Sequence, residues 1–376
     1  MNRVACRALI AVFFATGSLA AMEASAEDIS LSTDFRFRYE NDWDSIKADG
    51  APRDDRGRLR LRLRASVAYK PNDWLDFAIR ARSGNGKSQQ SPHVTIADFD
   101  GNRRGDADAV LDKYFVRVRR EGMTIWGGRN GFPFFKQNEL FWDDDVTVLG
   151  GAASYPVELG GAGTIKFTGG GFILPAGMWD YTGRLFAGQA LYETKLDAAS
   201  VKAAAGLFAI DADRDDPDNA ILLQGNGARD YTVLAVNLQS KWTVAGRPLT
   251  LGGDVFLNLE DYDDNPDPFT RANADETEGF AASAFYGDLK DSGHWLAGYS
   301  YARIEQFAVD NSFAQDDWVR FGSATQTRAS NIKGHEVRLG YAVTPKINLL
   351  ARLYLVEAIT TVEDGNRFRL DLNVKF

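Results

Sequence analysis

The chain has 376 residues and a formal net charge of -9, from 43 lysines and arginines against 52 aspartates and glutamates. This balance argues against a nucleic-acid partner, which would require a basic footprint, and the single cysteine excludes a disulfide framework or a cysteine-based zinc site. Mean hydropathy is -0.30, and beyond the first residues no apolar run approaches the roughly 18 residues that a membrane helix needs.

Residues 1–26 have the pattern of a secretory signal peptide. Two arginines precede an apolar run, and Ala-Ser-Ala ends the segment with small residues. A buried N-terminal helix is the alternative. We expect cleavage after Ala26, which leaves one exported domain over residues 27–376. That domain contains no cysteine, because Cys6 lies in the segment that is removed.

The first predicted strands carry charge on one face and apolar side chains on the other. In residues 29–39 phenylalanines alternate with arginines, and residues 58–64 read RLRLRLR. A period of two is the period of a strand, because successive side chains point to opposite faces. Taken alone, such a strand would also fit a soluble sandwich, with leucines in the core and arginines in water.

The same alternation recurs along the rest of the chain, and helical periodicity is almost absent. Sixteen strands are predicted in total. The fourteen that follow the first two are expected near residues 75–82, 113–119, 123–129, 146–155, 163–171, 183–197, 200–210, 228–239, 249–258, 277–287, 294–308, 331–343, 347–355 and 367–376.

The connections between these strands alternate in length. Short turns such as Lys-Pro-Asn-Asp at residues 70–73 separate long polar stretches. Short connections on one rim and long ones on the other are typical of transmembrane barrels. We therefore expect an all-β, transmembrane antiparallel barrel of about 16 strands, with short periplasmic turns and long extracellular loops. The long loops are expected at residues 41–56, 83–108, 130–145, 172–182, 211–227, 260–276 and 309–330.

A barrel assigns a role to each face of its strands. The leucines face lipid and the arginines face a water-filled lumen, and exchanging the faces would cost about 2–4 kcal/mol for an arginine at the bilayer midplane. The residues predicted to line the pore are Arg36, Arg38, Arg58, Arg60, Arg62, Arg64, Arg80, Arg82, Arg117, Arg119 and Arg129.

One local segment resembles a known family. Leu111-Asp112-Lys113-Tyr114-Phe115-Val116, the run WGGRNGFPFF at residues 126–135 and Trp142-Asp143-Asp144-Asp145 are similar to a unit of the bacterial outer-membrane porins described as putative porins, which are akin to alginate-export and oligosaccharide-channel barrels. The resemblance covers about forty residues in detail and the remainder in architecture. It implies passive diffusion of small hydrophilic solutes across the outer membrane, commonly by a homotrimer, among outer-membrane lipid and lipopolysaccharide.

The resemblance also implies roles for the third long loop and for the C-terminus. In porins the third loop folds into the barrel and narrows it, so the acids of residues 130–145 are expected to face the wall arginines. The alternative is that these acids cap strands or lie in solvent. The final strand ends in Phe376 and looks like the assembly signal read by the barrel assembly machinery. The expected constriction residues are Glu139, Asp143, Asp144 and Asp145.

The sequence leaves three alternatives to a general diffusion channel. These are a channel selective for acidic saccharides or other anions, a plugged structural or binding barrel, and a soluble periplasmic β-protein. No HExxH, GxSxG or phosphate-loop motif appears, so we expect no enzyme. We expect no cofactor and no metal site. Asp211, Asp213 and Asp215 have the spacing of a calcium loop, but Asp216 replaces its glycine and Leu222 its glutamate.

Overall fold

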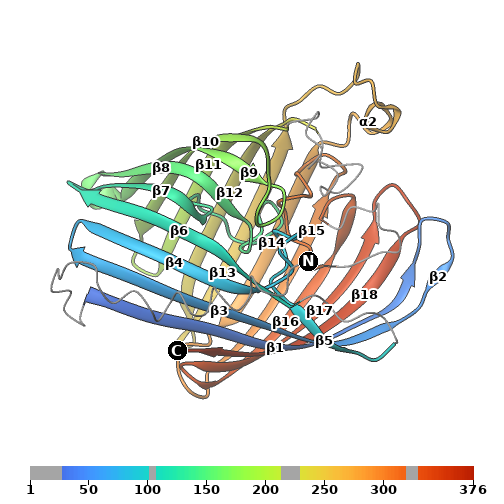
Figure 1. The fold of residues 1–376 in the computed structure, drawn as a ribbon, viewed down its shortest axis with the longest axis horizontal. Helices are drawn as coiled ribbons and strands as arrows, with labels where there is room; N and C mark the ends of the chain where they lie inside the picture. Colours follow the sequence, from blue (N-terminus) through green and yellow to red (C-terminus); the bar gives the residue numbers. More distant parts are fainter. Residues whose placement is uncertain (1–27, 101–106, 213–228, 319–328) are drawn as a thin grey trace, which may run out of the picture.

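The chain forms a closed antiparallel β-barrel (Figure 1). The computed structural model describes residues 28–100, 107–212, 229–318 and 329–376, so the predicted signal peptide at residues 1–26 lies outside the described residues. The wall strands, in chain order, are β1 (Ile29–Ile46), β3 (Arg56–Asn72), β4 (Leu75–Gly84), β6 (Asp108–Arg120), β7 (Met123–Gly131), β8 (Thr147–Glu158), β9 (Thr164–Pro175), β10 (Tyr181–Lys195), β11 (Ala199–Asp211), β12 (Tyr231–Val244), β13 (Arg247–Asn258), β14 (Glu278–Gly287), β15 (Trp295–Ile304), β16 (Ile332–Thr344), β17 (Ile347–Ala358) and β18 (Asp364–Lys375).

The barrel closes between its first and last strands. β1 pairs with β3 on one side and with β18 on the other, and both pairings are antiparallel. Two short strands, β2 (Pro52–Arg53) and β5 (Val94–Asp98), extend the sheet beside β1 and β3. Setting these two aside, the 18 strands of the sheet leave 16 in the wall. The predicted fold class and strand number are confirmed.

The connections alternate in length, except after β9 and after β17, where the next strand begins within a few residues. Short turns join β3 to β4 and β16 to β17, whereas long segments follow β4, β7 and β15. The loop expected at residues 172–182 is shorter than predicted, because β9 continues to Pro175 and β10 begins at Tyr181. The glycines at residues 169–171 interrupt the apolar alternation, so the end of this strand is not visible in the sequence. The connection after β13 contains one helical turn, α2 (Pro268–Ala272).

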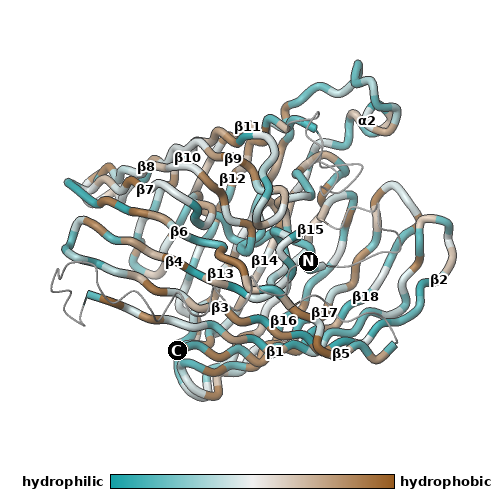
Figure 2. The backbone as a smooth tube through the Cα atoms, in the orientation of Figure 1, coloured by the Kyte–Doolittle hydropathy of each residue, from teal (hydrophilic) through white to brown (hydrophobic). Residues whose placement is uncertain are grey.

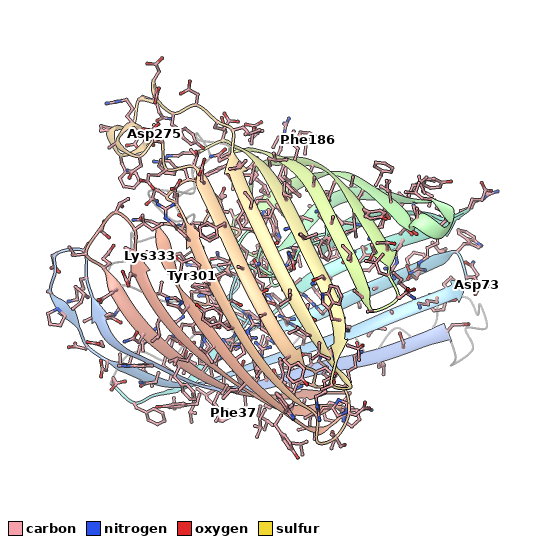
Figure 3. All side chains as sticks on the ribbon, turned by 180° about the vertical axis from the view of Figure 1, so that it is seen from behind. Phe37, Asp73, Phe186, Asp275, Tyr301 and Lys333 are labelled. Atoms are coloured by element: carbon pink, nitrogen blue, oxygen red, sulfur yellow. The ribbon has the colours of Figure 1, made fainter. Side chains whose placement is uncertain are left out.

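The outer surface of the wall is apolar. Leu63, Phe186, Leu207 and Leu339 are 47–59% exposed on outward-facing positions of their strands, and Phe186 stands out from the ribbon in Figure 3. Apolar and polar residues alternate along the strands (Figure 2), as a lipid-facing and a lumen-facing side require. Within the part of the chain that the structure describes, no helix is long and apolar enough to cross a membrane.

The interior of the barrel is filled on one side by an aromatic cluster. The segment between β7 and β8 contributes Phe132, Phe134, Phe141 and Trp142, and the inward faces of β11 and β13 contribute Phe208 and Phe256. The rings of Phe132 and Trp142 stack with centroids 4.4 Å apart, and those of Phe141 and Phe256 with centroids 5.6 Å apart. This packing holds the loop inside the barrel, beside the strands rather than above them.

Candidate functional site

A seam of charged side chains runs along the inward faces of β18, β1 and β3. Arg38 stands opposite Arg60 of β3 and Asp371 of β18, while Glu40 stands opposite Arg58 and Arg369. Arg38 Nε lies 2.6 Å from Asp371 Oδ1, and Arg369 Nε lies 2.7 Å from Glu40 Oε2. The arginine row is therefore neutralised in part by carboxylates of the wall itself. These partners come from strands more than three hundred residues apart, which sequence spacing could not reveal.

The predicted pore arginines differ in how far they reach water. The guanidinium groups of Arg38 and Arg82 are fully buried, whereas Arg117 and Arg119 keep 32% and 37% of their side chains exposed. Both of the exposed arginines bind Asp76 at the start of β4. The remaining arginines of β1, β3 and β4 lie on the same inward face with side chains 7–17% exposed: Arg36, Arg58, Arg60, Arg62, Arg64 and Arg80.

Arg129 lies apart from this row. It stands opposite Tyr114, whose side chain faces outward and is 38% exposed. Its guanidinium is buried and donates to the carbonyl of Met178 at 2.7 Å and to Thr147 Oγ1 at 2.8 Å. The structure thus places Arg129 beneath the segment that contains Met178, apart from the row of wall arginines. On β7 the position of Arg129 has the opposite parity to Trp126, which belongs to the interior cluster and pairs with Arg117.

The loop after β7 is anchored across the inside of the barrel. Gln137 Nε2 and Asn138 Nδ2 donate to the two oxygens of Asp254 on β13, at 2.9 and 2.5 Å. Phe135 exchanges two hydrogen bonds with the side chain of Gln189 on β10. These contacts explain why the segment does not extend outward like an ordinary surface loop.

The four acids expected at the constriction have different surroundings. Asp145 forms an ion pair with Arg64 of β3, and Asp144 pairs with Lys136 of its own loop. Glu139 and Asp143 lie in a buried acidic group, where burial first and neighbouring carboxylates second raise the pKa of both. Among the expected acids, only Asp145 has an ion pair with a predicted wall arginine in the part of the chain that the structure describes.

A second inward segment, residues 305–318 between β15 and β16, was not predicted as part of the site. Phe307 to Gln315 are buried, and Phe313 stacks on Trp142 of the other loop at 5.2 Å. Gln315 N donates to Glu139 O at 2.9 Å, and Asp143 N to Phe313 O at 2.7 Å. The aromatic residues in this otherwise polar loop were the available signal, because a solvated loop has no need of them.

Asp317, near the end of this second segment, forms ion pairs with arginines of the charged seam. Its carboxylate lies 2.5 Å from Arg369, 3.6 Å from Arg352 and 3.8 Å from Arg38. Burial alone would raise the pKa of Asp317, but the three arginines lower it well below its usual range. The loop acid that contacts the most arginines is thus Asp317, on the loop after β15. The sequence had predicted the acids of the loop after β7 for this role.

The two inward loops and the wall enclose a cavity of about 290 Å³. Lys136, Glu139 and Asp144 line it from one loop, and Asp317 and Trp318 from the other. The wall contributes Ser283, Ser300, Glu336, Arg338, Arg352 and Tyr354 from β14 to β17. The lining combines ionic groups of both signs with hydroxyls, a surface that favours polar solutes.

The C-terminal residue closes the last strand against the first. Phe376 N donates to Thr33 O at 3.1 Å, and Thr33 N donates to Phe376 O at 3.2 Å. The ring is 71% exposed on the outer side of the barrel. Phe376 therefore continues the apolar outer face of β18, and its signalling role stays a prediction. The acids of residues 213–218 lie outside the described residues.

Comparison with known proteins gives the same architecture. Residues 50–208 match the model of a family described as a putative porin. OprB from Pseudomonas putida, in its high-pH structure, has a TM-score of 0.58 at 13% identity, covering 93% of this chain and 94% of that one. OmpF from Salmonella typhi, in complex with daunomycin, gives 0.53 at 12% identity and 93% and 97% coverage. The trimer form of OmpT, an outer membrane protein of Vibrio cholerae, gives 0.51 at 11% identity and 93% and 99% coverage.

No curated protein matches the chain significantly. The solved structures share its fold at low sequence identity, and the family match covers the segment from the β2 region to β11. The family match and the similar structures both relate this chain to porins.

Proposed function

We propose that this chain, a porin-type barrel of the bacterial outer membrane, is a passive diffusion channel for small hydrophilic solutes. The observation that carries the proposal is the charged and hydroxylated cavity between the two inward loops and the wall of β14 to β17. Solutes would pass this point, where ionic groups and hydroxyls can replace water around a polar molecule. The porin fold and the putative-porin segment support the same function.

The charged residues have proposed roles in that passage. The arginines of β1, β3 and β4 would set the potential of one wall, with Asp145 and Asp317 as the opposing acids. Arg117 and Arg119 would contact solute most directly, because their side chains are the most exposed of the predicted arginines. The segments 132–146 and 305–318 would together form the constriction.

A planar-bilayer recording tests the channel, and liposome swelling tests its solutes. The refolded protein should give steady ohmic steps in potassium chloride, and vesicles containing it should swell faster in small sugars than in large oligosaccharides. Vesicles with heat-unfolded protein are the control. The absence of any steady conductance from correctly folded barrels would refute the proposal.

A plugged binding barrel is the second candidate. Residues 307–315 are buried and packed against the other inward loop, which is also what a plug would do. The same recording separates the two, because a plugged barrel conducts no steady current. Deleting residues 309–314 should open a plugged barrel, whereas in a channel it should only raise an existing conductance.

The proposal that the chain is a porin extends to its assembly and its partners. We propose a homotrimer, since OmpT, which has a similar fold, occurs in a trimer form. We propose contacts with lipid and lipopolysaccharide through the apolar outer band, and folding by the barrel assembly machinery through the final strand. We assign no catalytic role to any residue.

Anion selectivity is a third candidate, and the charge of the seam favours it. The inward faces of β18, β1 and β3 carry nine arginines but only four carboxylates. A net positive wall concentrates anions at a narrow point more than it concentrates cations. The arginines are Arg36, Arg38, Arg56, Arg58, Arg60, Arg62, Arg64, Arg367 and Arg369, and the acids are Asp34, Glu40, Asp42 and Asp371.

A further inference from the structure

Three arginines from three different wall strands converge on one carboxylate that does not belong to the wall. Arg38 comes from β1, Arg352 from β17 and Arg369 from β18, while Asp317 is on the segment between β15 and β16. Arg38 and Arg369 are nearly inaccessible, whereas the Asp317 side chain is 24% exposed. The most open member of the group is therefore the acid, which covers the three cations on the side of the lumen.

We propose that Arg38, Arg352 and Arg369 form a binding site for the carboxylate of an anionic solute, and that Asp317 occupies this site as an internal substitute. The proposal rests on the channel function above and names one chemical class among its solutes. Guanidinium groups suit this role because their planar donors match the two oxygens of a carboxylate.

The wall does not satisfy these arginines without an added anion. Asp371 forms a bidentate pair with Arg38, and Glu40 is shared between Arg369 and Arg58. Nη1 of Arg369 lies 2.5 Å from Asp317 Oδ1, and Nη1 of Arg352 donates to Tyr354 Oη at 3.3 Å. Nε of Arg352, however, has no hydrogen-bond partner among the described residues. A buried donor without a partner is costly, so a free carboxylate that reaches this Nε can bind better than Asp317 does.

The site opens onto the cavity between the two loops. Arg352 and Asp317 both line this cavity of about 290 Å³, together with Arg338 and Lys136. Ser283 on β14 and Ser300 on β15 line the same cavity with their hydroxyls. A solute that carries one carboxylate and several hydroxyls would therefore find donors for both kinds of group.

Exchange requires movement of one side chain only. The backbone carbonyl of Asp317 accepts a hydrogen bond from Arg367 Nη1 at 2.9 Å, and the ring of Trp318 packs against Tyr354 with centroids 6.2 Å apart. The backbone N–H of Gln315 donates a hydrogen bond to the backbone carbonyl of Glu139. With the segment held at these points, rotation of the Asp317 side chain frees the arginines without displacing the loop.

Current block by gluconate, with glucose as the uncharged match, tests the proposal. In single-channel recordings gluconate should interrupt the current of the native channel weakly, because it competes with Asp317. In Asp317→Asn the internal competitor is lost, and the apparent affinity for gluconate should rise at least about tenfold, as expected when the free site becomes the dominant state. Asp317→Glu should restore the weak block.

Two further variants make the test specific. Asp316→Asn removes the neighbouring acid, which has no ion pair with the residues that the structure describes, and should leave gluconate block unchanged. Arg352→Gln should weaken block in both the native and the Asp317→Asn background. Unchanged affinity in Asp317→Asn, an equal rise in Asp316→Asn, or equal block by glucose would overturn the site while leaving the channel function intact. A protein without any conductance would refute the channel instead.

Discussion

Arg38 and Asp371 face each other across the seam where the first and last barrel strands meet. Arg38 Nε lies 2.6 Å from Oδ1 and Nη2 lies 2.9 Å from Oδ2, with both side chains at most 1% exposed. The two residues are directly opposed in the register of β1 and β18. This pair joins the ends of the barrel wall and lies within the charged seam.

Removing one partner of this pair should destabilise the barrel. Asp371→Asn leaves a buried guanidinium without its bidentate acceptor, which typically costs about 3–5 kcal/mol. Urea unfolding in lipid vesicles should show that loss. Glu193→Gln is the matched control, because its ion pair with Lys202 has both side chains about 38% exposed, and such pairs contribute at most about 1 kcal/mol. Equal effects of the two changes would contradict the argument.

Cysteine labelling should separate the two faces of β3. Single cysteines at Arg60 and Arg62 should react with a membrane-impermeant thiol reagent, and those at Leu61 and Leu63 should not, because inward and outward positions alternate. A cysteine at Arg117 should react fastest, since that position is the most open of the three arginines. Rapid labelling at Leu63 in intact membranes would show that the assigned faces are wrong.

The inward loop after β7 should loosen when its anchor on β13 is removed. Asp254→Ala removes the acceptor of Asn138 Nδ2 and leaves Gln137 Nε2 with only the backbone carbonyls of Leu238 and Gly253. We expect more frequent current fluctuations in single-channel recordings, as the loop samples other positions. Asp264→Ala in the exposed connection after β13 is the control and should record as the native protein does. A quiet Asp254→Ala channel would mean that the aromatic packing alone holds the loop.

Docking of the second inward loop should depend on pH near neutrality. Burial raises the pKa of Asp310 to about 7, although hydrogen bonds from Ser312 and the charge of Arg229 oppose the shift. A carboxyl with a raised pKa favours the docked state while it is protonated, so docking should weaken as pH rises from about 4 through 7. Current fluctuations should increase over that range. In Asp310→Asn, which remains neutral, the fluctuations should vary less with pH, and the remaining dependence would come from Glu139 and Asp143, whose pKa values are also raised.

Deleting Phe376 should impair assembly of the barrel. The residue pairs with Thr33 through two backbone hydrogen bonds and continues the apolar outer face of β18. The shortened protein should still reach the periplasm but should lose the heat-modifiable migration of a folded barrel in gels. Phe376→Tyr keeps an aromatic end and should migrate normally. Normal migration of the deletion variant would remove the terminal residue from the assembly signal.

Strand positions could be predicted from the sequence because they depend on a local pattern. RLRLRLR at residues 58–64 fixes two faces by itself, and the register that follows places Arg62 inward and Leu63 outward. The position of Arg129 is harder to predict, because the glycines at residues 127 and 128 leave no alternation of side chains around it. Its face follows only from the pairing of β7 with β6, in which Trp126 is the residue opposite Arg117.

The contents of the lumen were harder to predict, because they depend on contacts between distant segments. The acids at residues 139–145 were a reasonable choice for the constriction, but only Asp145 meets a wall arginine in the described part of the chain. Asp317 fills that role through a loop of the far half of the sequence. Its aromatic neighbours Phe313 and Trp318 were visible, yet their partners Trp142 and Tyr354 follow only from the closed barrel.

The pairing of β1 with β18 sets the order in which the molecule can be completed. Residues 34 and 375 are neighbours in this seam, so closure waits until almost the whole chain is available. Contacts of such sequence separation form slowly, because a long loop must close before they contribute. Until then both end strands expose unpaired backbone groups, and the arginines of β1 lack Asp371. Any agent that pairs with the free edge of β18 during this interval would compete directly with β1, and the exposed edge is therefore the most vulnerable surface of the unfinished barrel.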